Sequence, residues 1–249
     1  MVIDTGLGLL HTKDQLQICS EYIDLWKLGW ATSQLQPPEV IESKISILRE
    51  HEISVCNGGT LLELAEFQGI SSKLFSVLAD VGADATEISS GSLEISSDRV
   101  CELISEAKSY RLRPYCEVGK KIPENDYEVS EYNERIKLFL EAGAEKVIIE
   151  ARESGVGVGV MDSEGNVNED DLSAIIDGID IDSVIFEAPK KNQQVFFLKR
   201  FGPEANLGNI APSDVISLET LRRGLRGDTI EDFYFVVGER HLHKHGWRD

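Results

Sequence analysis

Tyr115-Cys-Glu-Val-Gly-Lys-Lys121 is a short apolar run that delivers one carboxylate and two adjacent lysines where a predicted strand gives way to a loop. Catalytic groups of α/β enzymes gather at such strand ends. Glu117 can bind a metal ion or orient a base, while Lys120 and Lys121 can hold an oxyanion or, if burial lowers their pKa, deliver a proton. Taken alone, these seven residues favour a solvated lysine pair. The functional interpretation gains weight because other predicted strands end in the same way.

The same pattern repeats along the chain, where short β-rich segments alternate with longer amphipathic segments. The repeat is about 30 residues long, which is the size of one βα unit. The predicted strands cover residues 2–4, 22–28, 53–57, 85–89, 113–118, 146–151, 183–188 and 205–210. The predicted helices between them include residues 72–82, 98–110, 131–143 and 169–179. Eight such units in 249 residues predict a single-domain α/β fold, a TIM (β/α)8 barrel. A doubly wound open sheet is the alternative, weakened because no G-x-G-x-x-G turn follows the first strand.

Composition sets the domain organisation and excludes several functions. No linker-like stretch divides the chain, so we assign residues 1–235 to the barrel and residues 236–249 to a C-terminal tail. With 44 acidic and 25 basic residues the net charge is −19, which argues against nucleic acid as a partner. No apolar run approaches the ~20 residues that span a bilayer, and no leader opens the chain, so we expect a cytoplasmic protein that does not bind membranes. The four scattered cysteines fit reduced thiols better than disulfides or a zinc site.

In a barrel the carboxyl ends of all strands meet on one face, so polar residues at the predicted strand ends should lie together. These residues are Asp4, Lys27, Asn57, Glu87, Glu117, Glu150 and Glu187. Isolated buried glutamates would cost several kcal/mol, and Mg²⁺ is a cation that prefers hard oxygen ligands. We therefore predict a Mg²⁺ site with Glu117, Glu150 and Glu187 as ligands, and as further cationic partners Lys27, Lys120, Lys121 and Arg152. The alternative is a set of ion pairs that close the barrel mouth without catalysis.

Segments after the last two predicted strands offer groups for an anionic substrate. F-E-A-P-K-K-N-Q-Q (residues 186–194) follows the seventh strand, and after the eighth, Pro212 and Ser213 start a helix whose free N–H groups could hold phosphate. TIM barrels commonly bind phosphate in this region. Arg222, Arg223 or Arg226 could reach the same anion, although each alone is typical of a surface helix. The substrate-binding candidates are Asn57, Lys190, Asn209, Ser213 and Arg223.

Eight motifs carry a family resemblance that covers nearly the whole chain, up to about Asp228. They are K-L-G-W-A-T-S (27–33), N-G-G-T-L-L-E (57–63), T-E-I-S-S-G-S (86–92), E-V-G-K-K (117–121), I-I-E-A-R-E-S-G (148–155), F-E-A-P-K-K-N-Q-Q (186–194), N-L-G-N-I (206–210) and S-L-E-T-L-R-R-G-L-R-G-D (217–228). Together and in this order they resemble the phosphosulfolactate synthase family.

The resemblance implies a Mg²⁺-dependent TIM-barrel lyase, a homo-oligomer, that adds sulfite to phosphoenolpyruvate. The implied product is (2R)-phospho-3-sulfolactate, which leads to coenzyme M in methanogens and to sulfolactate in some bacteria. By the family's pattern, Lys121 is the general acid, and Lys120, Lys27 and arginines such as Arg152 screen the anionic groups of the substrates.

Two positions depart from the family's pattern. Thr5 stands where the family typically has a lysine, and Ser90 stands where it commonly has an aspartate. Two alternatives are therefore kept open: a lyase that adds a different nucleophile to phosphoenolpyruvate, and a non-catalytic relative of the plant heat-stress-associated type. The intact E-V-G-K-K and R-R-G-L-R-G-D motifs favour an enzyme.

Overall fold

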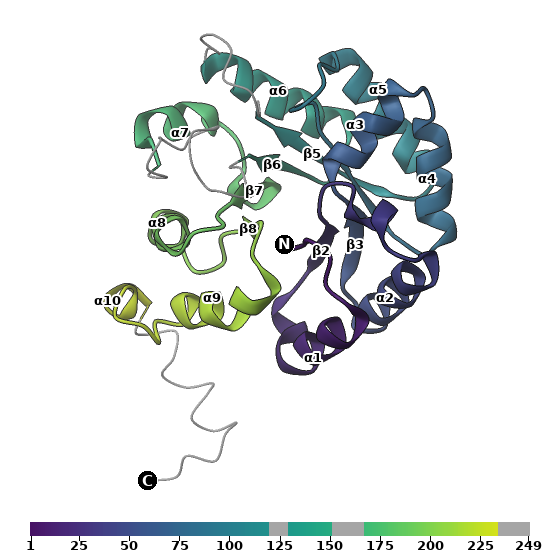
Figure 1. Ribbon diagram of the computed structural model, residues 1–249. Helices are drawn as coiled ribbons and strands as arrows, with labels where there is room; N and C mark the ends of the chain where they lie inside the picture. The colour runs from purple at the N-terminus through teal and green to yellow at the C-terminus, as the bar shows by residue number, and fades with distance from the viewer. Residues whose placement is uncertain (120–128, 151–166, 234–249) are drawn as a thin grey trace.

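The strands lie at the centre of the fold and the helices surround them (Figure 1). The computed structural model describes residues 1–119, 129–150 and 167–233. The strands are β1 (Val2–Asp4), β2 (Leu25–Leu28), β3 (Ser54–Asn57), β4 (Ala85–Ile88), β5 (Arg113–Val118), β6 (Lys146–Ile149), β7 (Val184–Glu187) and β8 (Leu207–Gly208). The helices are α1 (Leu9–Cys19), α2 (Pro38–Glu50), α3 (Gly59–Phe67), α4 (Ser71–Asp80), α5 (Ser97–Ser109), α6 (Val129–Ala142), α7 (Glu169–Ile175), α8 (Lys191–Phe201), α9 (Val215–Arg222) and α10 (Ile230–Phe233). Short 3-10 turns are η1 (Ser20–Tyr22), η2 (Thr32–Leu35), η3 (Ile181–Ser183) and η4 (Pro212–Asp214). Within these described ranges, no helix has the length and apolar character needed to cross a membrane.

Within the described residues all strand pairs are parallel and follow the order of the chain, in a sheet of β1-β2-β3 and a sheet of β4-β5-β6-β7-β8. Val2 forms a parallel bridge with Ile210, which joins the first strand to the end of the last. β3 and β4, both of which the structure describes in full, are not paired by backbone hydrogen bonds. Instead, the Val55 N–H on β3 donates to the side chain of Asp84, just before β4, with a distance of 2.9 Å to Oδ1. When each strand pairs with the next one in the chain and the first strand also meets the last, the strands form a barrel rather than a doubly wound sheet. The predicted (β/α)8 fold class is therefore confirmed.

The strand boundaries follow the prediction most closely where no local turn competes with the sheet. β1 and β5 begin and end where predicted, whereas β2 starts at Leu25, three residues later than predicted, because η1 extends to Tyr22. β8 ends early because Asn209 has a φ of 53°, in the left-handed region that strands do not use. α7 begins at Glu169 as predicted, and the side chain of Asn168, directly before it, accepts hydrogen bonds from the N–H groups of Asp170 and Asp171.

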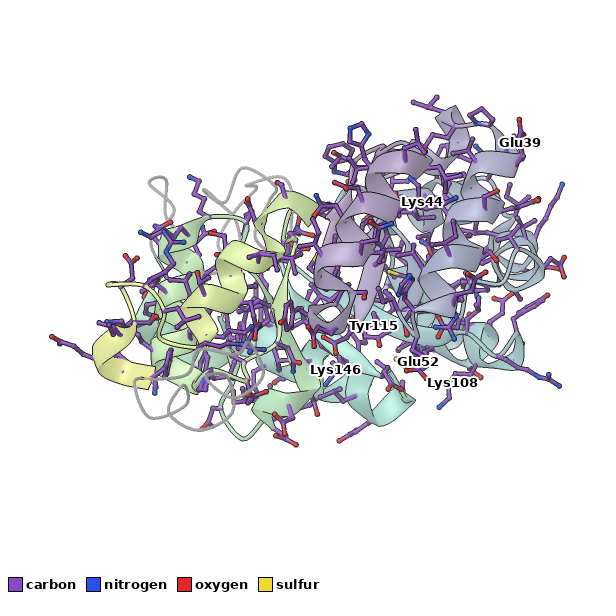
Figure 2. The ribbon with its side chains drawn as sticks, turned by 90° about the horizontal axis from the view of Figure 1, so that it is seen from below. Glu39, Lys44, Glu52, Lys108, Tyr115 and Lys146 are labelled. Atoms are coloured by element: carbon purple, nitrogen blue, oxygen red, sulfur yellow. The ribbon has the colours of Figure 1, made fainter. Side chains whose placement is uncertain are left out.

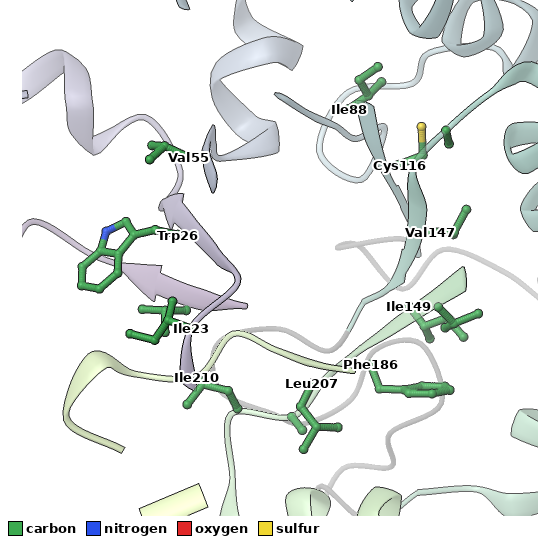
Figure 3. Packing of buried hydrophobic residues seen from close by; sticks show 14 of the residues in the cluster. Ile23, Trp26, Val55, Ile88, Cys116, Val147, Ile149, Phe186, Leu207 and Ile210 are labelled. Atoms are coloured by element: carbon green, nitrogen blue, oxygen red, sulfur yellow. The ribbon is translucent and has the colours of Figure 1, made fainter. Parts of the chain in front are cut away.

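Alternation along the strands divides the core into two parts. Residues such as Trp26, Val55 and Phe186 point outward and pack under the helices (Figure 3). The opposite faces of the strands build a smaller cluster inside the barrel from Leu25, Cys56, Ala85, Tyr115, Ile148 and Ile185. Two positions beyond four of these residues, the same inward faces carry Lys27, Glu87, Glu117 and Glu187. The apolar cluster inside the barrel thus lies beneath a layer of charged side chains at the carboxyl ends of the strands. We call Lys27, Glu87, Glu117 and Glu187 the ionised layer.

Asp4 does not join that layer, so its predicted place at the barrel mouth is wrong. Its Oδ2 atom accepts hydrogen bonds from Lys44 Nζ at 2.7 Å and from Trp26 Nε1 at 3.2 Å. Lys44 comes from α2 (Figure 2) and is fully buried. The reason is the pleat: Asp4 shares the outward face of β1 with Val2. The Asp4–Lys44 pair therefore fastens β1 to α2.

Candidate active site

A buried lysine bridges two strands at the barrel mouth. Lys27 on β2 places its Nζ atom 3.0 Å from Glu87 Oε2 on β4 and 3.0 Å from Glu187 Oε1 on β7. Burial by itself would lower the pKa of Lys27, but the carboxylates of Glu87, Glu187 and Glu117 outweigh it and raise that pKa well above its usual value. The raised pKa favours the positively charged form of Lys27 and makes it a poorer proton donor than an ordinary lysine.

Glu150, directly after β6, lies next to the glycine of E-V-G-K-K. It is 1% exposed, and its N–H donates to the Val118 carbonyl at 3.1 Å. A Cβ atom placed on Gly119 would lie 2.5 Å from Glu150 Cβ and 2.7 Å from Glu150 Oε2. The motif needs glycine here so that β5 and the Glu150 carboxylate can approach each other.

Gly119→Ala is expected to lower the free energy of unfolding by about 1–3 kcal/mol, the usual cost of overpacking a filled site. The clash is with Glu150 Cβ, which the backbone of β6 holds in place, so a side-chain rotation cannot relieve it. The midpoint of urea unfolding measures the effect. Gly227→Ala is the matched control, because its added Cβ atom meets nothing within 4 Å. Equal midpoints for the two variants would contradict the packing argument.

Asn57 and the two glycines after it connect β3 to β4. The Asn57 side chain donates to the Gly58 carbonyl at 2.9 Å and the Glu87 carbonyl at 3.3 Å, and its Oδ1 accepts from Thr86 Oγ1 at 2.7 Å. The Gly59 N–H then donates to Glu87 Oε1 at 2.7 Å. Asn57, predicted to bind substrate, is thus at the mouth but uses its amide to close the seam between the two sheets.

The structure places the other predicted substrate ligands in different regions. Lys190 is half-buried at the start of α8, and Asn209 is buried directly after β8. Ser213 is exposed in η4. Arg223 follows α9 at the opposite end of the barrel, where its Nε atom lies 2.5 Å from Glu219 Oε1 and its guanidinium covers the Tyr22 ring at 5.1 Å. The structure therefore does not bring Arg223 together with Lys27.

Three predicted catalytic residues, Lys121, Lys120 and Arg152, lie outside the described residues. They follow β5 and β6 in the sequence, and those strands present Glu117 and Glu150. Both glutamates are buried at the carboxyl ends of neighbouring strands.

The predicted Mg²⁺ ligands are only partly grouped. Glu187 already forms an ion pair with Lys27. Within residues 1–119, 129–150 and 167–233, no three His, Cys, Asp or Glu side chains come close enough to hold a metal ion. Buried carboxylates nevertheless have the oxygen chemistry that Mg²⁺ prefers, and this ion commonly uses one or two of them with water and substrate oxygens. Glu117 and Glu150 fit that smaller requirement.

A cavity of about 730 Å³ opens at the amino ends of the strands, away from the ionised layer. Tyr115 and Lys146, both labelled in Figure 2, line it together with Arg113, Tyr22 and Arg223. None of Lys27, Glu87 or Glu187 contributes to its described lining. Because TIM-barrel enzymes place their chemistry at the carboxyl ends of the strands, we assign the site to the ionised layer rather than to this cavity.

Sequence reasoning missed Lys44 and Glu63, both buried and charged. A signal was present for each. Lys44 interrupts the apolar stripe of Ile41, Ile45 and Leu48 on α2, and Glu63 follows Leu62 on the buried face of α3.

A parallel eight-stranded barrel with a buried ionised layer at the carboxyl ends of its strands defines a TIM-barrel enzyme. Residues 1–228 match the family model described as (2R)-phospho-3-sulfolactate synthase (ComA), and the chain belongs to this family.

Its relatives agree with that assignment. The chain is 45% identical over 232 residues to the phosphosulfolactate synthase of Methanocaldococcus jannaschii, with 92% of each sequence covered. It is 24% identical to Protein HEAT-STRESS-ASSOCIATED 32 of Arabidopsis thaliana, with 81% of this chain and 76% of that protein covered. Among solved structures, 3-hexulose-6-phosphate synthase from Salmonella typhimurium has a TM-score of 0.55 at 14% identity and 94% coverage of both chains, which supports the fold.

Proposed function

We propose that the protein is a carbon–sulfur lyase that adds sulfite to phosphoenolpyruvate, with Mg²⁺, to give (2R)-phospho-3-sulfolactate. The observation that carries this proposal is the family match over residues 1–228, which includes the intact E-V-G-K-K motif. The 45% identity to a named synthase favours this reaction over a non-catalytic role of the heat-stress-associated kind.

The chemistry requires fixed positive charge and one proton donor. The sulfur lone pair of sulfite attacks the methylene carbon, and the C=C electron pair moves into the substrate carboxylate as an enediolate. A proton then adds to the carbon that bears the phosphate. Lys27, held ionised by Glu87 and Glu187, supplies a preorganised positive charge for this developing anion. Lys121 is the proposed proton donor, and Lys120 and Arg152 are proposed to bind the anionic groups of the substrates.

For Mg²⁺ we propose Glu117 and Glu150 as the protein ligands, because both are buried carboxylates at the carboxyl ends of the neighbouring strands β5 and β6. When bound, the ion would act as a Lewis acid that withdraws charge from the substrate carboxylate. The remaining ligands would be water and substrate oxygens, as is common for Mg²⁺.

The test is incubation of the purified protein with phosphoenolpyruvate and sulfite, with and without Mg²⁺, followed by detection of phosphosulfolactate by mass spectrometry. We expect product only when Mg²⁺ is present, and loss of product on addition of a chelator. Binding of phosphoenolpyruvate without product would indicate a different nucleophile. Neither binding nor product would refute the proposal and favour a non-catalytic relative.

A further inference from the structure

The loop after β4, residues 89–93, is attached to α3 by one buried carboxylate. Glu63 on α3 is 1% exposed. Its Oε1 atom accepts hydrogen bonds from the Ser89 hydroxyl and, at 3.1 Å, from the Gly91 N–H. Its Oε2 atom accepts from the N–H groups of Ser92 at 2.9 Å and Leu93 at 2.6 Å. Four donors on one carboxylate make this the main attachment of the loop to α3.

These hydrogen bonds also exclude one role for the loop. Successive backbone N–H groups in a turn commonly form a binding site for phosphate or another anion. Here the N–H groups of Gly91, Ser92 and Leu93 already bind the carboxylate of Glu63. The loop after β4 is therefore an internal support rather than a substrate phosphate site.

The loop packs directly against the residues that hold Lys27. A Cβ atom on Gly59 would lie 2.3 Å from Ser89 Oγ and 2.9 Å from Glu87 Oε1, so the first residue of α3 is wedged between the loop and Glu87. The Gly59 N–H fixes Glu87 Oε1 at 2.7 Å, while Glu87 Oε2 lies 3.0 Å from Lys27 Nζ. Movement of the loop would therefore change the position of the Glu87 carboxylate.

We propose that Glu63 is a positioning residue for the reaction: it holds residues 89–93 on α3, so that Glu87 stays in place and orients the Lys27 ammonium. The proposal rests on the proposed function, since Lys27 is there assigned to the developing negative charge. Glu63 itself acts at a distance, through Ser89, Gly59 and Glu87.

The test compares Glu63→Gln and Glu63→Asp with Glu66→Gln. A glutamine keeps one acceptor oxygen but turns its NH₂ group toward backbone N–H donors, whereas aspartate keeps the charge on a shorter chain. We expect Glu63→Gln to lower kcat about 10–100-fold, as loss of a supporting partner of an active-site group commonly does. The KM for phosphoenolpyruvate should change little, because the charge on Lys27 is used in the transition state. Glu63→Asp should recover part of kcat.

Glu66→Gln is the matched control, because Glu66 lies on the same helix but pairs with Arg99 at 2.6 Å instead of with residues 89–93. Its kinetics should remain those of the unsubstituted protein. Ser89→Ala is a milder variant for the case that Glu63→Gln fails to fold: it removes one of the four donors and should lower kcat by a smaller factor without raising KM.

Hydrogen exchange of the free protein provides a readout that does not depend on activity. We expect faster exchange at Gly91, Ser92 and Leu93 in Glu63→Gln and not in Glu66→Gln. Unchanged exchange, or full kcat with a loosened loop, would overturn the positioning role. An inactive unsubstituted protein would refute the proposed function instead, and the exchange result would still decide whether Glu63 anchors the loop.

Discussion

Lys27→Met is expected to lower the free energy of unfolding by about 3–5 kcal/mol, the usual cost of removing one partner from a buried ion pair. Methionine has a similar length, so the loss comes mainly from charge rather than from volume. The substitution leaves Glu87 and Glu187 buried without the ammonium that lies 3.0 Å from each. For a chain of this size we expect the midpoint of thermal unfolding to fall by about 10 °C.

Lys199→Met provides the control for Lys27→Met. Lys199 lies 2.9 Å from Asp232 in a solvent-exposed pair, and such pairs contribute at most about 1 kcal/mol. A loss for Lys27→Met no larger than that for Lys199→Met would show that the bridge does not hold the barrel mouth together.

The pH dependence of this difference follows from the raised pKa of Lys27. A lysine whose pKa is raised in the folded state contributes its full stability below its unfolded pKa, about 10.4, and loses it only as the pH rises through the folded value. The difference between the unsubstituted protein and Lys27→Met should therefore be constant from about pH 7 to pH 10. Urea unfolding at several pH values measures it, and a decline near pH 8 would contradict an ionised Lys27.

Lys121→Ala is expected to lower kcat by about 10²–10⁴-fold, the usual contribution of a general acid, while the fold stays intact. Under the proposed mechanism nothing else then protonates the carbon that bears the phosphate. Steady-state rates of phosphosulfolactate formation measure the loss, and circular dichroism checks the fold.

Two further variants separate proton donation by Lys121 from simple charge. Lys121→Arg keeps the positive charge but has a side chain that does not release its proton near neutral pH, so it should remain as impaired as Lys121→Ala. Lys120→Ala should mainly raise the KM for phosphoenolpyruvate, because Lys120 is proposed to bind an anionic group. Near-normal kcat in Lys121→Ala would remove Lys121 from its role.

The sequence predicted the fold through features that depend on near neighbours. The bounds of β5 and the start of α7 at Glu169 follow from local sequence patterns, and both are found where expected. Eight repeats of one βα unit are then compatible with only a few strand topologies. The early end of β8 at Asn209 depends on a single backbone angle, which residue type does not determine.

The site was less predictable because the end of a strand shows where a residue lies along the barrel, but not whether its side chain points into the barrel or toward the helices. Asp4 and Glu187 both end strands, yet Asp4 faces α2 and Lys44, while Glu187 faces Lys27 inside the barrel. The inward or outward face becomes clear only when the strands are paired. Arg223 shows the same limit, since a motif adjacent to the last strand carries its side chain to the far end of the barrel.

The barrel is divided into sheets of three and five strands, and active-site residues form a contact between them. Selection for activity is therefore linked to selection for folding. Lys27 belongs to the first sheet, and Glu87 and Glu187 belong to the second. A descendant that exchanges Lys27 to accept a new substrate would also loosen the contact between the sheets. New specificities should therefore arise first in the loops, or only after stabilising substitutions elsewhere have accumulated.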